Sequence, residues 1–91
     1  MTYALYAVSD AVSGLFAAPF MAMSDDDAIR SFKCDYDRAL NQAPSSPFAM
    51  FIGDYSLYRV GSFDASTGLL ESVSIPALVL SGRSLLRSDD K

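Results

Sequence analysis

Apolar side chains occupy almost every position of residues 2–8 (TYALYAV), so this segment is apolar on both faces of an extended strand. A two-sided strand of this kind is expected in the middle of a sheet, and Ser9 with Asp10 closes it. Another apolar stretch follows, but Pro19 lies inside it and cannot donate a ladder hydrogen bond. The pattern therefore predicts a loop that leads into a short edge strand at about residues 19–23.

A helical pattern begins at Ser24, whose hydroxyl precedes three aspartates at residues 25–27. A hydroxyl cap followed by carboxylates is typical of a helix start, because both interact with the free N–H groups there. A polar run with two prolines at residues 41–47 predicts that the helix ends there and that a loop follows to about Phe48. Residues 50–52 are expected to anchor this loop to the core. The apolar residues at helical spacing are Ile29, Phe32, Tyr36 and Leu40, with Ala28 and Ala39 beside them.

The second half of the chain has the pattern of a hairpin. Aromatic and branched residues at 54–63 and 69–75 flank a stretch with turn chemistry at 64–68. Pro76 is expected to interrupt the second strand, because it lacks a backbone donor. Residues 77–80 are apolar enough to pack or pair again.

The order of these elements predicts an α+β fold, with a small antiparallel sheet of about four strands in the order β-β-α-β-β and one helix packed on one face. We expect a single domain over residues 1–82 and a flexible tail over residues 83–91, with a short helical turn at Leu85 and Leu86. One helix leaves the other sheet face uncovered. Apolar faces of this kind usually become interfaces, so we expect a homo-oligomer, with a homodimer as the first hypothesis.

Composition narrows the classes of function. The chain has 91 residues, 51% of them hydrophobic, and a net charge of −4, which is the wrong sign for binding nucleic acid by bulk charge alone. It has no His and one Cys, so it lacks the residues for a zinc site or a Cys-His or Ser-His-Asp pair. We therefore expect no enzyme activity and no cofactor or metal. Neither a signal peptide nor an apolar stretch of about 20 residues is visible, so we expect no membrane contact.

Aromatic rings and cations in the strands are the candidates for binding chemistry. Tyr3, Tyr6, Tyr55, Tyr58 and Phe63 could stack on bases, although burial in the core or an interface explains each ring as well. Strand alternation places Arg59 on one face with Tyr55, Leu57 and Phe63, and a guanidinium both pairs with phosphate and stacks on bases. A salt bridge is an equal alternative for Arg59. The candidate nucleic-acid-binding residues are Tyr6, Tyr55, Tyr58, Arg59 and Lys33.

Three further features favour ordinary explanations. Lys33 lies on the solvated side of the helix, where nearby aspartates offset its charge. The triplet at residues 25–27 could attract Mg²⁺ or Ca²⁺, but consecutive helical residues point in different directions, so helix capping is the better explanation. Cys34 lies opposite the apolar stripe of the helix, and the chain has no His to activate its thiol, so we assign it no role.

Several motifs in collinear order resemble the small nonstructural protein of gokushovirus-like microviruses (Microviridae), which are single-stranded DNA bacteriophages. The most specific is DYSLYRVGSFD at residues 54–64. The resemblance implies a non-capsid, DNA-binding protein that acts when the phage makes or packages single-stranded genomes. It brings no catalytic residues. The other matching segments are residues 6–10, 19–20, 28–33 and 67–68.

Together, these observations predict a phage protein that binds single-stranded DNA in replication or packaging through the sheet surface of an assembly, in the cytoplasm of the infected bacterial host. The alternative is a protein-binding adaptor to phage replication or capsid-assembly proteins that makes no contact with nucleic acid. The net charge of −4 and the apolar residues 75–86 favour this alternative.

Overall fold

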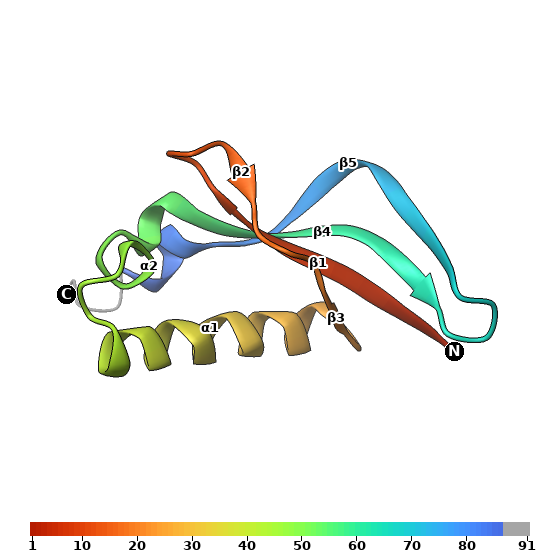
Figure 1. Cartoon of the computed structure of the whole chain (residues 1–91), viewed down its shortest axis with the longest axis horizontal. Helices are drawn as coiled ribbons and strands as arrows, with labels where there is room; N and C mark the ends of the chain where they lie inside the picture. Colours follow the sequence, from red (N-terminus) through yellow and green to blue (C-terminus); the bar gives the residue numbers. More distant parts are fainter. Residues whose placement is uncertain (87–91) are drawn as a thin grey trace.

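The computed structural model describes residues 1–86, which form an antiparallel sheet with one long helix against it (Figure 1). The predicted α+β fold is confirmed. The strands are β1 (Thr2–Asp10), β2 (Leu15–Phe16), β3 (Phe20–Ala22), β4 (Tyr55–Asp64) and β5 (Leu69–Ser81). The helices are α1 (Asp25–Gln42), α2 (Pro47–Met50) and the 3-10 helices η1 (Ile52–Asp54) and η2 (Gly82–Leu85).

The sheet has the order β2-β1-β4-β5, and β3 pairs with β1 beside β2. β1 is therefore a central strand, as its two-sided apolar pattern predicted. β3 confirms the short edge strand expected near residues 19–23. β2 was not predicted, since only residues 15 and 16 pair there, with Asp10 and Ser9 of β1.

A bulge in β4 changes which sheet face the side chains after Val60 point to. Arg59 pairs with Tyr6 of β1 and Gly61 pairs with Leu5, so Val60 between them has no partner on β1. The side chains that follow Val60 therefore point to the opposite face from the one that simple alternation gives. Phe63 was expected to share a face with Arg59. It lies instead on the face of Tyr58, because of this extra residue.

β5 carries the larger irregularity. Arg59 pairs with Ala77 and Gly61 pairs with Ser72, so residues 73–76 bulge outward opposite Val60. Pro76 lies in this bulge, where its missing N–H disturbs no ladder bond. β5 continues through Pro76 as one strand, so the expected interruption is found only in its pairing with β4, which resumes at Ala77.

The core lies between α1 and the sheet. Ser24 caps α1 as predicted, and its hydroxyl accepts a hydrogen bond from the backbone N–H of Asp27 at 3.2 Å. The apolar stripe of α1 packs inward as far as Tyr36, whereas Leu40 in the last turn is 44% exposed. The core cluster comprises Tyr6, Ala28, Phe32, Ile52 and Leu57.

The connection after α1 is more structured than the sequence indicated. Ser46 caps the short helix α2 by accepting from the N–H of Ala49, so helix begins where a loop to Phe48 was predicted. This turn of helix directs Phe48 inward, where its ring packs at right angles to that of Tyr55 with centroids 5.1 Å apart. Ile52 is buried as expected, whereas Met50 and Phe51 are exposed because α2 points them outward.

The chain beyond β5 turns back onto the core. Gly82 is buried, and a Cβ there would collide with the carbonyl oxygens of Ile52 and Tyr55. The helical turn expected at Leu85 is confirmed as η2, and Leu85 packs against the core cluster. The start of the predicted tail, residues 83–86, therefore belongs to the folded body. Its remainder, residues 87–91, lies outside the described residues.

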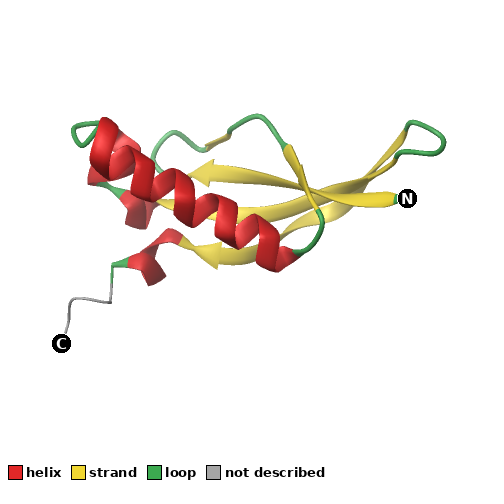
Figure 2. Cartoon of the chain, turned by 90° about the horizontal axis from the view of Figure 1, so that it is seen from below, coloured by secondary structure: helices red, strands yellow, loops and turns green. Residues whose placement is uncertain are grey.

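The molecule is elongated, with extents of 45 × 25 × 23 Å. α1 covers part of one sheet face, and the turn between β4 and β5 extends beyond the N-terminal end of this helix (Figure 1). Figure 2 shows α1 crossing the sheet, with β5 along one margin. No described helix is long and apolar enough to span a bilayer.

Candidate nucleic-acid interface

The sheet face that points away from α1, here called the outer face, can be assigned from the strand register. Directly paired residues share a face, and Tyr6 packs with α1, so its neighbours on β1 point outward. Ala7 pairs with Tyr58, and Tyr3 pairs with Phe63. The apolar side chains of the outer face are Tyr3, Leu5 and Ala7 of β1, Phe16 of β2, Met21 of β3, Tyr58 and Phe63 of β4, and Leu70 and Leu78 of β5. Ser9, Ser56, Ser72 and Ser81 lie on the same face.

Most side chains of the outer face are aromatic or aliphatic, and none of those just named is charged. Tyr3, Tyr58 and Phe63 are each partly exposed. Phe16, at 47% exposure, contacts Tyr58 edge-on, with ring centroids 5.6 Å apart. Rings in this state are fixed by their neighbours and still present surface to a ligand.

The rings lie mainly on the two central strands. Tyr3 and Phe63 are directly opposite each other on β1 and β4, which brings their Cβ atoms to about 4.5–5.5 Å. Tyr58 lies farther along β4, beyond the bulge at Val60. A sheet that is backed by a helix and carries rings on its central strands can hold unpaired bases by stacking, as RNA-recognition sheets do.

Tyr6, one of the candidate binding residues, belongs to the core. It is 1% exposed, so its ring cannot stack on a base, and its hydroxyl donates a 2.6 Å hydrogen bond to Oδ1 of Asp25. Burial, followed by the hydrogen bond and the nearby charge of Asp25, raises the pKa of Tyr6 to about 12. Tyr6 therefore has a structural role, and its ring is not available for the base stacking expected from the sequence.

Tyr55 also serves the fold. Its ring packs against Phe48, and it lies among the residues that surround the core cluster. Burial, with smaller contributions from Asp10 and Asp54, raises its pKa above the ordinary tyrosine value. Of the tyrosines chosen from the sequence, Tyr58 is the one that the structure places on the outer face.

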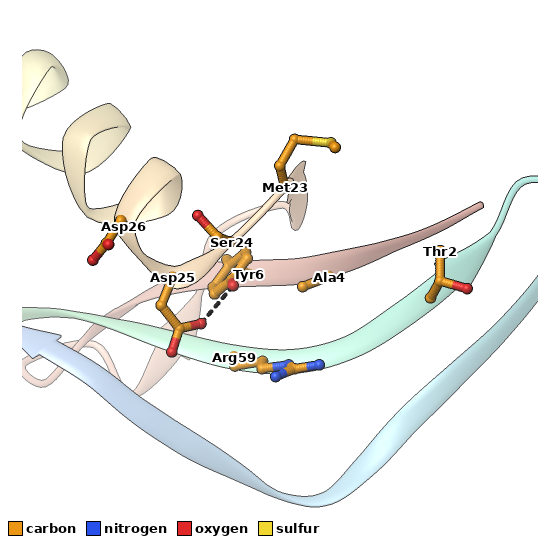
Figure 3. Close-up of a pocket in the computed structure, with 8 residues that line it drawn as sticks. All are labelled: Thr2, Ala4, Tyr6, Met23, Ser24, Asp25, Asp26 and Arg59. Atoms are coloured by element: carbon orange, nitrogen blue, oxygen red, sulfur yellow. Dashed lines mark hydrogen bonds between the residues drawn. The ribbon is translucent and has the colours of Figure 1, made fainter.

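Arg59 and Tyr58 point to opposite faces of β4. Arg59 is exposed on the side of α1, and no ion pair to it is present within residues 1–86. It lines an open cavity of about 440 Å³ beyond the start of the helix, where the Tyr6–Asp25 hydrogen bond forms one wall (Figure 3). The other lining residues are Thr2, Ala4, Met23, Ser24 and Asp26.

Lys33 lies apart from both groups. It is exposed on α1, in the layer behind the sheet, and so cannot share a surface with Tyr58. The neighbouring charges of α1 are mixed, and Arg38 forms an exposed 3.0 Å ion pair with Asp35. The five candidates from the sequence therefore do not form one site. Tyr58 lies on the outer face, Arg59 at the cavity, Lys33 on the helix, and Tyr6 and Tyr55 in or beside the core.

Sequence reasoning missed part of the outer face. Tyr3 and Phe63 were in the wider set of rings but not among the chosen site residues, and Phe16 was not considered. Val60-Gly61 inside a strand was the available signal, because glycine within a strand often marks a bulge. A Cβ at Gly61 would collide with the carbonyl oxygen of Glu71, so the close approach of β5 requires glycine here.

The geometry defines a class: a small α+β protein whose antiparallel sheet is covered by helix on one face and open, with aromatic rings, on the other. Residues 3–85 match the family described as Phage ORF5 protein, and the chain therefore belongs to that family. Membership confirms the part of the sequence resemblance that identified a phage protein. No curated protein and no solved structure matches the chain.

Proposed function

We propose that this phage protein binds single-stranded DNA by stacking bases on the rings of the outer face. The observation that carries the proposal is the placement of Tyr3, Tyr58 and Phe63 on the two central strands of a face that no helix covers. Bases must be unpaired to present their flat surfaces to such rings, so duplex DNA fits this face poorly.

Stacking can outweigh the unfavourable net charge. Each base stacked on an aromatic ring contributes about 1–3 kcal/mol, so three rings near the top of this range supply affinity in the micromolar range without a basic groove. Among the described residues the outer face carries no cation, and Arg59 points to the opposite face of β4, so few phosphates of a bound strand would meet a positive charge. Affinity is therefore expected to fall with salt on a shallow slope, about −0.7 to −1.4 in log–log form for one or two phosphate contacts.

The biological setting of the proposal comes from the family and from the resemblance to gokushovirus nonstructural proteins. A phage with a single-stranded genome has to collect unpaired DNA during replication and packaging in the cytoplasm of its bacterial host. A small protein that recognises the faces of bases, without reading a sequence, suits that step.

The proposal is tested by fluorescence anisotropy with labelled oligo-dT at low salt. Tyr58→Ala should weaken binding about 5-fold or more, which corresponds to the lower limit for one lost stacking contact. Phe51→Ala is the matched control, because this ring is 54% exposed but lies in the connection after α2, away from the outer face. Equal affinities for wild type and both variants, or no binding at all, contradict the proposal.

A protein-binding adaptor is the second candidate, and the absence of charged side chains from the outer face favours it. An apolar face without cations is also what a protein partner from the replication or capsid-assembly machinery would cover. Pull-down from infected cells separates the two functions. Phage proteins that stay bound after nuclease treatment support the adaptor, whereas their loss after nuclease treatment supports DNA binding.

A further inference from the structure

The rings of the outer face form two separate pairs. Tyr3 and Phe63 are directly opposite each other on β1 and β4, and are here called the Tyr3–Phe63 pair. Phe16 of β2 meets Tyr58 of β4 edge-on with ring centroids 5.6 Å apart, and these two are called the Phe16–Tyr58 pair. All four rings are at least partly exposed, so each pair can accept a base.

The Phe16–Tyr58 pair lies over the central strand β1. Ala7 is directly opposite Tyr58 and points to the outer face, yet it is only 3% exposed. A small side chain is covered in this way when two rings meet above it. Phe16 is brought to this point by β2, which pairs with Ser9 and Asp10 at the end of β1. The short strand β2 therefore completes a ring pair that the central strands alone would not form.

The strand register gives the distance between the two pairs. Tyr58 is level with Ala7 on β1, whereas Phe63 is level with Tyr3, so the pairs are separated by the rise from residue 3 to residue 7. At about 3.3 Å per residue this rise is about 13 Å. Leu5 and Gly61 pair in the row between them, and neither carries a ring. The outer face therefore has two stacking subsites with a gap between them.

We propose that the two pairs hold two non-adjacent bases of one DNA strand, so that the bound stretch is at most about five nucleotides long. Stacked bases of a strand are about 3.4 Å apart, so 13 Å corresponds to about four steps. A stretched backbone spans the same gap with fewer nucleotides. The two bases of a dinucleotide would have to separate to almost four times their stacked distance, so a dinucleotide occupies one pair at a time.

This inference rests on the proposed function and adds the length of DNA that the outer face recognises. A strand that reaches both pairs binds the second one within the same complex, so its affinity exceeds that for either pair alone. Loss of either pair should then weaken its binding at least about 5-fold, the lower limit for one stacked base. For a dinucleotide the two pairs are alternative sites, and their association constants add. The fractions of affinity that remain after loss of one pair or the other therefore sum to about one.

NMR titration of the full chain with an unlabelled thymidine dinucleotide and hexanucleotide at low salt tests the inference. Tyr3→Leu combined with Phe63→Leu removes one pair, and Phe16→Leu combined with Tyr58→Leu removes the other. Leucine keeps apolar packing on the sheet and removes the ring. Far-UV circular dichroism checks that each double variant is folded, and the single variants Phe63→Leu and Tyr58→Leu replace a double variant that is not.

Both double variants should bind the hexanucleotide at least about 5-fold more weakly than wild type, whereas at least one of them should keep about half or more of the affinity for the dinucleotide. Phe51→Leu is the matched control, because this exposed ring lies away from the outer face, and it should bind both ligands like wild type. If both double variants lose most of their affinity for the dinucleotide, the rings form one compact site and the inference is wrong. It is also wrong if either double variant binds the hexanucleotide like wild type. Both results contradict the two-pair inference alone, whereas wild type that binds neither ligand contradicts the proposed function itself.

Discussion

Replacing Tyr6 with Phe removes one hydroxyl from the junction between the sheet and the start of α1. That hydroxyl donates a 2.6 Å hydrogen bond to Asp25, the first residue of the helix. The ring itself stays in place, because it is 1% exposed and packs against Phe20 with centroids 6.0 Å apart. A hydrogen bond to a charged group contributes about 1.5–3 kcal/mol, so the variant should be less stable by that amount at neutral pH.

The same contact predicts how stability depends on pH. Folding raises the pKa of Tyr6 from 10.0 to about 12, so the folded chain holds this proton more tightly than the unfolded chain does. The associated stability is present in full below pH 10 and is lost as the pH rises toward 12, by roughly 3 kcal/mol. Above pH 10 the difference between wild type and Tyr6→Phe should therefore shrink.

Urea unfolding followed by circular dichroism from pH 8 to pH 11.5 measures both effects. Tyr55→Phe is the control, because burial also raises the pKa of Tyr55 but its hydroxyl has no hydrogen-bond partner among the described side chains. Tyr55→Phe should make stability fall less steeply as the pH rises above 10. At pH 8 it should not lose as much stability as Tyr6→Phe does. Parallel stability curves for wild type and Tyr6→Phe would show that the Tyr6–Asp25 contact does not couple the sheet to α1.

Three other substitutions are tested by urea unfolding at pH 7. They probe the core, the N-cap of α1, and the packing of the chain after β5 against the core. Leu57→Ala should cost about 2–5 kcal/mol, because the side chain is fully buried; a loss below 1 kcal/mol would contradict its central position. Ser24→Ala should cost about 1 kcal/mol through the lost helix cap, and Ser24→Thr should restore most of it. Gly82→Ala should cost about 1–3 kcal/mol, because its Cβ would collide with two backbone carbonyls, and an unchanged midpoint would refute that packing.

The elements that local chemistry determines could be predicted from the sequence. The cap at Ser24 and the periodic apolar residues after it located α1, and the turn residues after β4 located the hairpin. The two-sided apolar pattern of β1 correctly indicated a central strand, since both of its faces bury side chains. These signals are local, so no knowledge of distant contacts is needed to read them.

The faces of β4 could not be predicted, because they depend on how β1 and β5 pair with it. One unpaired residue at Val60 moves Phe63 to the side of Tyr58 and leaves Arg59 on the other. Simple alternation along the sequence therefore placed Phe63 and Arg59 on one face, although the fold places them on opposite faces. Tyr6 was misassigned for a similar reason, since its burial depends on α1 packing across β1. β2 and α2 are too short to have a periodic pattern.

Chemical shifts of the outer face during titration with oligo-dT test the central claim most directly. Two-dimensional NMR of the full chain should show changes at Tyr3, Tyr58 and Phe63 that saturate together, while residues at the Arg59 cavity and on the exposed side of α1 change little. Changes confined to Arg59, Lys33 or α1, with the rings of the outer face unaffected, would contradict the account.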